Sequence, residues 1–267
     1  MTSSVFPISS AVSGHFDYRV TTGSTNTDLV AEAGALPDRA VIASLDQRAG
    51  RGRLDRAWSS PAGQTLAASV LLRPRRSGGE PLGDDDWAWF PLLAGTALHG
   101  AIGGLLPDAD VTLKWPNDVQ IRGLKVSGLL ADLVIVDGRP DAVVMGSGIN
   151  LTIPPERLPT PTSTSLAIEG AEGSADDIGD AVFAAYLERL FSLVDALAAG
   201  GEGAVRDAVT AACATVGRRV RVELPDGTKR HGLAQALGEG GRLVVLEDDS
   251  GESLVVAAGD VTHLRYE

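Results

Sequence analysis

Residues 124–151 of this 267-residue chain are LKVSGLLADLVIVDGRPDAVVMGSGINL. Two apolar runs flank Asp137-Gly138-Arg139-Pro140, and a short Asp-Gly turn between such runs is typical of a β-hairpin. The second run ends in Gly146-Ser147-Gly148, where bare backbone allows a ligand to approach a strand closely. The stretch therefore predicts two paired strands with a ligand near the glycines.

Other apolar segments upstream predict further strands. Residues 40–44 (AVIAS) are short and partly β-branched, and residues 65–73 (TLAASVLLR) form a second run of this kind. Residues 111–121 begin as a strand and break at Pro116-Asn117-Asp118, a strong turn signal.

The helical segments are less uniform. Residues 87–106 contain no Asp, Glu, Lys or Arg and approach the roughly 20 residues of a membrane span. Pro91, His99 and four glycines interrupt them, and the acidic residues 84–86 suit a helix N-terminus, so we expect a buried helix. Apolar spacing predicts two more helices at 175–199 and 202–213.

The composition changes after Val216. Short alternating segments follow, cut by Asp-Gly, Gly-Gly and Ser-Gly turns, which predict a small β-barrel of about 50 residues. We expect two domains, 1–214 and 215–267.

Charge and cysteine content restrict the function. The chain has 23 Lys+Arg against 35 Asp+Glu, a net charge of -12, which opposes extended nucleic-acid binding. One cysteine, Cys213, permits no intrachain disulfide and fits a reducing cytoplasm. No basic residue precedes Arg19, so a secretory signal is not expected. We predict a cytoplasmic protein without nucleic-acid or membrane partners.

A cationic segment stands out against this acidic background. Residues 50–58 are GRGRLDRAW, with three arginines, two glycines and one tryptophan. Guanidinium groups fit phosphate or carboxylate bidentately, and glycines let the backbone approach such a ligand. The segment is either a solvated basic turn or a loop that binds a small anion, and the local reversal of charge favours the loop.

A polar cluster lies upstream at Ser24-Thr25-Asn26. All three side chains can cap a helix, and Asp28 stands three residues after Thr25, as in a capping box. Alternatively, the cluster and the free N–H groups of the helix bind a carboxylate or polar head group. Both interpretations stay open at this point.

Several common catalytic motifs are absent from the sequence, namely GxxxxGK[ST], GxGxxG, HExxH, CxxC and GxSxG. Four histidines are scattered without metal-ligand spacing, so metal ligands remain unknown. What remains is an anion site made of arginines, lysines and isolated carboxylates.

At this point the motifs resemble the biotin protein ligase family. GRGRLDRAW is followed by KWPNDV at 114–119, KVSGLL at 125–130 and GSGIN at 146–150, with STN at 24–26 and Gln47 upstream. The resemblance runs from about Tyr18 to Asn150, and a terminal barrel is also what the family carries.

The resemblance implies an α+β fold, in which helices flank a central mixed β-sheet of the class II synthetase type and a small SH3-like β-barrel follows. It further implies a catalytic domain over 1–214 and a two-step reaction that uses ATP and Mg²⁺. Biotin is first activated as biotinyl-5′-AMP. It is then transferred to a specific lysine of the biotin carboxyl carrier domain of an acyl-CoA carboxylase.

Matching each position to the family motifs assigns roles to single residues. The residues expected to act in catalysis are Lys125, Arg53, Arg56 and Asp118. The expected biotin-binding residues are Ser24, Thr25, Asn26, Gln47, Gly50, Arg51, Gly52, Arg53, Lys125 and Gly128. The expected nucleotide-binding residues are Arg51, Arg53, Arg56, Trp58, Lys114, Asn117, Gly148 and Asn150. Asp118 either orients the incoming amine or serves only the turn.

The sequence departs from the family pattern in places. Leu54-Asp55 stand where many members have a basic residue and a glycine, and Asp132 stands where Glu is usual. Some relatives carry an N-terminal helix-turn-helix, but the motifs here begin near residue 24, so we expect a ligase without DNA binding. Two other functions remain open, a lipoate-type protein ligase and a non-catalytic nucleic-acid-binding module.

Overall fold

The main sheet has seven strands and mixed polarity. The computed structural model describes residues 5–58, 61–258 and 263–266. The strand order is β1-β2-β5-β9-β8-β7-β6; only β1 and β2 pair in parallel. The strands are β1 (Phe16–Tyr18), β2 (Val41–Ser44), β5 (Thr65–Leu72), β6 (Val111–Lys114), β7 (Asp118–Ile121), β8 (Leu124–Val136) and β9 (Arg139–Asn150). The predicted central mixed sheet is confirmed.

The β8–β9 hairpin is the longest pairing in the sheet and confirms the first prediction. Its two-residue turn consists of Asp137 and Gly138, whose φ angles are 50° and 76°. Positive φ at both positions is the type I′ geometry that matches the twist of paired strands. The register places Gly128 opposite Gly148, so two residues without side chains lie next to each other in the sheet.

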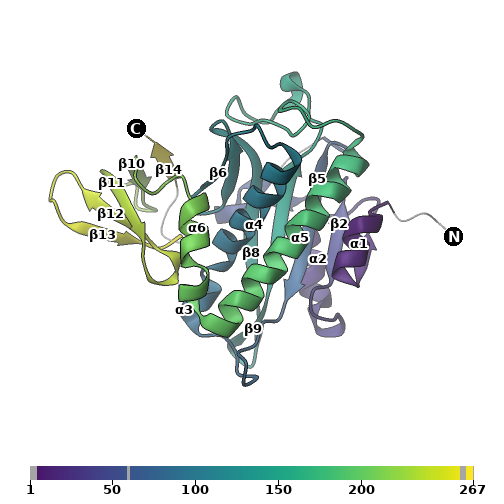
Figure 1. Cartoon of the computed structure of the whole chain (residues 1–267), viewed down its shortest axis with the longest axis horizontal. Helices are drawn as coiled ribbons and strands as arrows, with labels where there is room; N and C mark the ends of the chain where they lie inside the picture. Colours follow the sequence, from purple (N-terminus) through teal and green to yellow (C-terminus); the bar gives the residue numbers. More distant parts are fainter. Residues whose placement is uncertain (1–4, 59–60, 259–262, 267) are drawn as a thin grey trace.

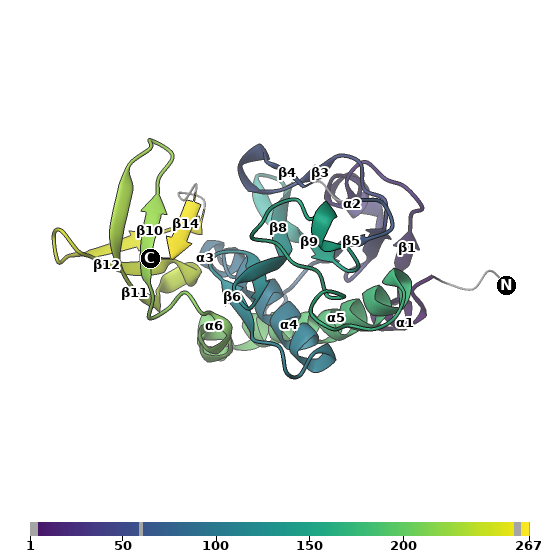
Figure 2. The same ribbon diagram turned by 90° about the horizontal axis from the view of Figure 1, so that it is seen from above.

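Helices cover the two faces of the sheet unequally (Figures 1 and 2). Leu66, Ala68 and Val70 of β5 belong to the large core beneath α4 and α5, whereas Leu71 packs in a smaller core under α2. This alternation follows from the two-residue period of a strand. The α-helices are α1 (Pro7–Ser13), α2 (Thr25–Glu32), α3 (Asp84–Trp87), α4 (Phe90–Leu105), α5 (Ala175–Gly200) and α6 (Arg206–Ala212).

The apolar helix expected at 87–106 belongs to the core. In the described part of the chain, one helical stretch, 84–105, is long and apolar enough to cross a membrane by composition alone. Its apolar window is 56% buried inside the protein. Packing against the sheet and α5 therefore accounts for its hydrophobicity.

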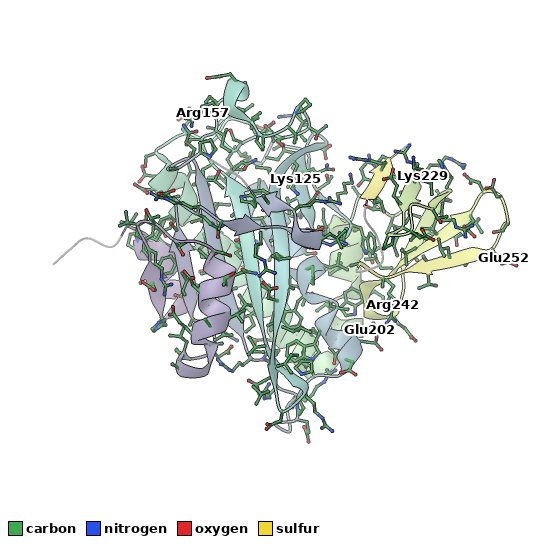
Figure 3. The ribbon with its side chains drawn as sticks, turned by 180° about the vertical axis from the view of Figure 1, so that it is seen from behind. Lys125, Arg157, Glu202, Lys229, Arg242 and Glu252 are labelled. Carbon is green, nitrogen blue, oxygen red and sulfur yellow. The ribbon has the colours of Figure 1, made fainter. Side chains whose placement is uncertain are left out.

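The C-terminal residues form a separate antiparallel sheet in the order β13-β12-β11-β10-β14 (Figure 1, yellow-green). Its turn at 239–241 docks on the main body: Trp115 Nε1 donates to the Gly241 carbonyl at 3.0 Å, and Arg242 pairs with Asp85 at 3.0 Å. Figure 3 shows Arg242 on this side of the sheet, next to Glu202. The strands are β10 (Arg219–Glu223), β11 (Lys229–Leu237), β12 (Leu243–Glu247), β13 (Ser253–Val256) and β14 (His263–Tyr266).

A short hairpin lies over the main sheet on the face that carries α2 (Figure 2). It consists of β3 (Gly50–Arg51) and β4 (Ala57–Trp58), joined by a 3-10 turn at Arg53–Asp55. The predicted loop lies between β2 and β5 in the chain and forms a hairpin of its own. We call residues 50–58 the arginine hairpin.

Candidate active site

A cleft of about 520 Å³ lies between the arginine hairpin, the sheet face opposite α4 and α5, and strand β14. Every site residue predicted from the sequence lines it except Gly50. The structure thus brings together residues that are more than one hundred positions apart. The predicted lining residues are Ser24, Thr25, Asn26, Gln47, Arg51, Gly52, Arg53, Arg56, Trp58, Lys114, Asn117, Asp118, Lys125, Gly128, Gly148 and Asn150.

The floor of the cleft is made of glycine backbone. A Cβ atom at Gly148 would lie 2.5 Å from Trp58 Cε2, and one at Gly128 would lie 3.0 Å from Trp58 Cζ3. Real Cβ atoms do not approach other heavy atoms so closely, so the indole ring rests directly on the sheet because both residues are glycines. The sequence prediction of bare backbone beside a ligand site has this physical basis.

Gly50 serves the hairpin rather than the cleft wall. It is buried, and a Cβ atom there would lie 2.5 Å from both Gln47 Nε2 and the carbonyl oxygen of Trp58. Glycine therefore lets β3 pack against the Gln47 side chain. The structure does not bring Gly50 to the cleft, where the sequence had placed it among the biotin contacts.

An ion pair lies beside the glycine floor. Lys125 Nζ is 2.6 Å from Asp118 Oδ1, and the ammonium group lies 5.4 Å from the centroid of the Trp58 ring. β7 and β8 pair side by side and set this geometry, with Asp118 opposite Gly128. Lys125 lies on the face of the sheet seen in Figure 3. The pair holds a cation and a potential proton acceptor within one hydrogen bond of each other.

A second lysine, Lys114, lines the cleft beside β14. Burial lowers the pKa of Lys114; nearby Asp118 acts in the opposite direction, and Arg265 and Lys125 lower the pKa further. The Lys114 ammonium also lies 5.0 Å from the centre of the Tyr266 ring. Removal from water and crowding with other cations both oppose the charged form. An anionic ligand would relieve this crowding.

The arginine hairpin contacts the turn between β6 and β7 and the segment between β13 and β14. Arg53 donates to Asn117 Oδ1 at 3.4 Å and to the carbonyl oxygen of Ala258, which precedes β14. Burial lowers the pKa of the Arg53 guanidinium, and the neighbouring Arg56 adds to this effect, while Asp118 opposes it. Asn117 in turn donates to the Leu129 carbonyl at 2.8 Å. Arg53 is therefore fixed between the cleft and the C-terminal sheet.

The tip of the hairpin carries backbone strain. Leu54 has φ 54° and ψ 44°, in the left-handed region that favours glycine, and its side chain is half-exposed. A branched, non-glycine residue in that region costs of order 1 kcal/mol. Leu54, which stands where many family members have a basic residue, therefore occupies strained backbone.

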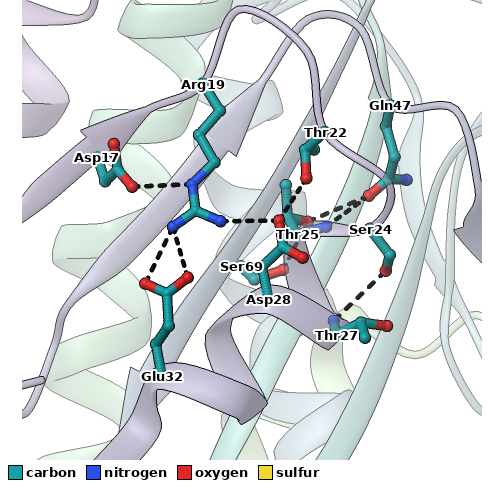
Figure 4. A network of polar contacts seen from close by, with 10 residues as sticks. All are labelled: Asp17, Arg19, Thr22, Ser24, Thr25, Thr27, Asp28, Glu32, Gln47 and Ser69. Atoms are coloured by element: carbon teal, nitrogen blue, oxygen red, sulfur yellow. Dashed lines mark hydrogen bonds and ion pairs between the residues drawn. The ribbon is translucent and has the colours of Figure 1, made fainter. Parts of the chain in front are cut away.

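The polar end of the cleft lies at the N-terminus of α2. Ser24 caps the helix by accepting from the Thr27 N–H, and Gln47 Oε1 accepts from the Thr25 N–H at 2.9 Å. Figure 4 shows these contacts. The capping interpretation is confirmed for Ser24, whereas the capping box between Thr25 and Asp28 does not form.

The carboxylate of Asp28 contacts other partners. It accepts from the Thr22 hydroxyl and from Arg19 Nη1, the latter at 2.8 Å (Figure 4). Arg19 also binds Asp17 and Glu32. A cation was available to Asp28, and a charge-assisted hydrogen bond is stronger than the bond to a neutral N–H group.

The sequence did not identify one further wall of the cleft. It lies in the region 151–174 between β9 and α5, where Thr160, Thr162 and Ser163 line the cleft. This loop pairs with the start of β8, because Lys125 N donates to Thr162 O at 2.8 Å. Asn150 holds the loop through a 2.9 Å bond to the Thr164 carbonyl. No local pattern in the sequence indicates such pairing.

The family match agrees with this fold and site. Residues 18–150 match the biotin/lipoate A/B protein ligase family, and residues 215–264 match the biotin protein ligase C-terminal domain. A mixed sheet with a cationic cleft and an appended antiparallel sheet thus defines a protein ligase of the biotin/lipoate class.

Full-length relatives narrow the assignment. The chain is 36% identical over 251 residues to the biotin--[acetyl-CoA-carboxylase] ligase of Mycobacterium tuberculosis, which covers 91% of this chain and 87% of the relative. The Paracoccus denitrificans ligase of the same name is 30% identical over 241 residues, covering 89% and 96% of the two chains. The chain belongs to the biotin protein ligase family.

A solved structure supports the fold. The biotin protein ligase from Aquifex aeolicus in complex with biotin and ATP superimposes with a TM-score of 0.74 at 23% identity, covering 95% of this chain and 99% of that one. The likeness extends over both sheets.

Proposed function

We propose that this protein is an ATP-dependent biotin protein ligase. It activates biotin as biotinyl-5′-AMP and transfers the biotinyl group to a lysine of the biotin carboxyl carrier domain of an acyl-CoA carboxylase. The observation that carries the proposal is the Lys125–Asp118 pair at 2.6 Å on a glycine floor, beneath a hairpin that supplies Arg51, Arg53 and Arg56.

The first step joins two anions. A carboxylate oxygen of biotin attacks the α-phosphorus of ATP, the bond to the β-phosphate bridging oxygen breaks, and pyrophosphate leaves. Repulsion between carboxylate and polyphosphate opposes this approach, so fixed cations must offset both charges. Lys125 contacts the carboxylate and the α-phosphate, Arg51 and Arg53 cover the adenylate, and Arg56 meets phosphate oxygens.

The hairpin also protects the product. A mixed anhydride is hydrolysed when water reaches it, and closing a loop over the site excludes water. Trp58 lies on the floor formed by Gly128 and Gly148 and closes the adenine side. Lys114, Asn117 and Asn150 lie at the nucleotide end of the cleft.

The other end receives the biotin ring. Ser24, Thr25, Asn26 and Gln47 supply hydrogen-bonding groups there, and Gly52 lets the hairpin backbone approach the ligand. A cyclic urea can satisfy such groups. The dithiolane ring of lipoate has no N–H or C=O groups and would leave them unpaired, which favours biotin over lipoate.

The second step consumes the adenylate. The lysine amine of the carrier attacks the biotinyl carbonyl carbon, an amide bond forms and AMP leaves. A free lysine has a pKa of about 10.4 and must lose a proton before it attacks. Asp118 is the one carboxylate among the described residues that line the cleft, and it accepts or orients this proton.

Magnesium accompanies the nucleotide. Among the residues described, no group of three or more His, Cys, Asp or Glu side chains could hold a metal ion. Mg²⁺ commonly binds one or two carboxylates together with substrate phosphates, and Asp118 fits that requirement. The ion would supply positive charge to the departing pyrophosphate.

The domain organisation and location follow the same proposal. Residues 1–214 form the catalytic domain and residues 215–267 the appended one, and the enzyme works in the cytoplasm. The carrier domain docks at the mouth of the cleft.

Mass spectrometry of a carrier domain tests the function. We expect a single biotinyl adduct on one lysine after incubation with the protein, ATP and biotin. We expect no adduct without ATP and none when lipoate replaces biotin. An unmodified carrier in the complete reaction, or a lipoyl adduct, would contradict the proposal.

A further inference from the structure

Ser69 is a buried hydroxyl beneath the polar end of the cleft. It lies on β5, is fully buried and does not itself line the cleft. Its Oγ is 2.5 Å from Asn26 Oδ1 and 2.7 Å from Thr25 Oγ1 (Figure 4 shows Thr25 above it). Both partners are at most 5% exposed, so water cannot replace these bonds.

The Asn26 amide is held from both of its ends. Its oxygen accepts from Ser69, and its nitrogen donates to Asp132 Oδ2 at 2.8 Å and to the Leu130 carbonyl at 3.4 Å. Neither an ionised carboxylate nor an amide oxygen can donate a hydrogen bond; both act only as acceptors. A flipped amide would place two acceptors against each other at Asp132, so the orientation of Asn26 is fixed.

The Thr25 hydroxyl is committed in the same way. Its single proton is donated either to Ser69 Oγ or to Gln47 Oε1, which is 3.3 Å away. In both cases the acceptor belongs to the protein, so the proton is not available to a ligand. Thr25 Oγ1 can therefore only accept a hydrogen bond from a ligand. The second lone pair of Asn26 Oδ1 is also an acceptor.

The position of the Asn26 amide is fixed as well as its orientation. A Cβ atom at Gly146 would lie 2.1 Å from Asn26 Oδ1 and 2.8 Å from its Cγ. The amide therefore lies flat on the backbone of β9. Three elements, β5, β8 and β9, together hold this side chain.

We propose that Ser69 and Asp132 are positioning residues that hold Thr25 and Asn26 as hydrogen-bond acceptors, so that this end of the cleft selects a ring with N–H donors. The inference deepens the proposed function and rests on it, since the ureido ring of biotin offers two such donors. Neither residue touches the substrate; each acts through Thr25 or Asn26.

The test compares Ser69→Ala with Ser127→Ala. Ser127 is also a fully buried sheet serine, and its hydroxyl has no hydrogen-bond partner among the described residues. Biotin and an analogue N-methylated on the ureido ring are compared in adenylate formation by each full-length variant. We expect Ser69→Ala to raise the KM for biotin about tenfold with the KM for ATP unchanged. The KM for the analogue, which lacks one N–H donor, should rise less. The ratio of the two KM values, which measures discrimination between biotin and the analogue, should therefore shrink.

Asp132 gives a second measurement should Ser69→Ala fail to fold. Asp132→Asn keeps the shape but allows Asn26 to flip, so we expect the same loss of discrimination, and Asp132→Glu restores the carboxylate and most of the selectivity. Equal losses for biotin and analogue, or no difference between Ser69→Ala and Ser127→Ala, would overturn the inference while wild-type activity stands. A wild-type protein that forms no biotinyl-5′-AMP overturns the proposed function instead.

Discussion

The two ends of the cleft differ in how they are built. The polar end, which we call the ring end because the biotin ring is proposed to bind there, contains Thr25, Asn26 and Ser69. These residues are almost completely buried, and Ser69 is hydrogen-bonded to both of the others. At the hairpin end, the Arg51 and Lys125 side chains are 47% and 32% exposed, and Arg51 Nη2 is 3.8 Å from its acidic neighbour Asp132. Buried hydrogen bonds hold the ring end, whereas the hairpin end is built from charged side chains that stay partly exposed.

Loss of the ammonium group at the hairpin end should have the largest effect. We expect Lys125→Ala to lower the rate of adenylate formation by about 10²–10³, because one fixed cation that stabilises the developing charge is removed. Biotin-dependent exchange of pyrophosphate into ATP measures this rate. The affinity for biotin alone should fall by a smaller factor, since only the contact to the carboxylate is lost and the ring end is intact. Exchange at the wild-type rate would mean that Lys125 is not in the reacting centre.

Crowding the ring end should have the next largest effect. Gly146→Ala places a methyl group 2.1 Å from Asn26 Oδ1, so the amide must move, and we expect the KM for biotin to rise about tenfold or more. Gly103→Ala is the matched control, because a Cβ atom there meets nothing within 4 Å. It lies in α4 and should stabilise the helix by about 1 kcal/mol. A Gly146→Ala enzyme with unchanged KM would contradict the preformed ring end.

Titration of Lys114 should reveal the electrostatic character of the hairpin end. Its pKa is lowered by burial, so the ammonium loses its charge at a lower pH than a free lysine does. The protonated Lys114 should contribute fully to ATP affinity at neutral pH. The affinity should then fall as the pH rises through this lowered pKa. Lys114→Arg should move the fall to higher pH, because guanidinium stays protonated. Binding of ATP to the two proteins over an alkaline pH series measures the shift; superimposable curves would exclude Lys114 as its origin.

Strain at the hairpin tip should give the smallest effect. Leu54 has φ 54°, so Leu54→Gly removes a cost of roughly 1 kcal/mol, while Leu54→Val adds a β-branched residue to the same unfavourable region. We expect the half-life of bound biotinyl-5′-AMP to be longest with glycine at position 54, shorter with leucine and shortest with valine. Each step should change the half-life by about fivefold or less. The reverse order would show that the tip adopts another conformation when a ligand binds.

Local patterns were enough to predict much of the fold and the site. The Asp137-Gly138 turn between apolar runs indicated the β8–β9 hairpin, and the run of motifs identified the residues of the hairpin end. The turn depends on neighbours in the sequence, and the site residues were predicted from the resemblance of several separate motifs to the biotin protein ligase family. Prediction succeeded where the physical cause is local.

The ring end shows where sequence reasoning ends. Ser69 lies in an apolar strand with nothing local to distinguish it, and its partners are 43 and 44 positions away. A capping box that includes Asp28 was one of two open interpretations, but Arg19 and Thr22 bind this carboxylate across a turn. Gly50 was predicted to contact biotin, and its close approach to Gln47 and Trp58 was not foreseen. In each case a contact between distant elements decided the outcome.

A crystal structure with biotinyl-5′-AMP bound tests the central claim most directly. We predict that the arginine hairpin closes over the adenylate, with Arg53 and Lys125 Nζ within hydrogen-bonding distance of the α-phosphate and the ureido ring against Thr25 and Asn26. A bound adenylate with the hairpin turned to solvent and neither cation near the phosphate would contradict it.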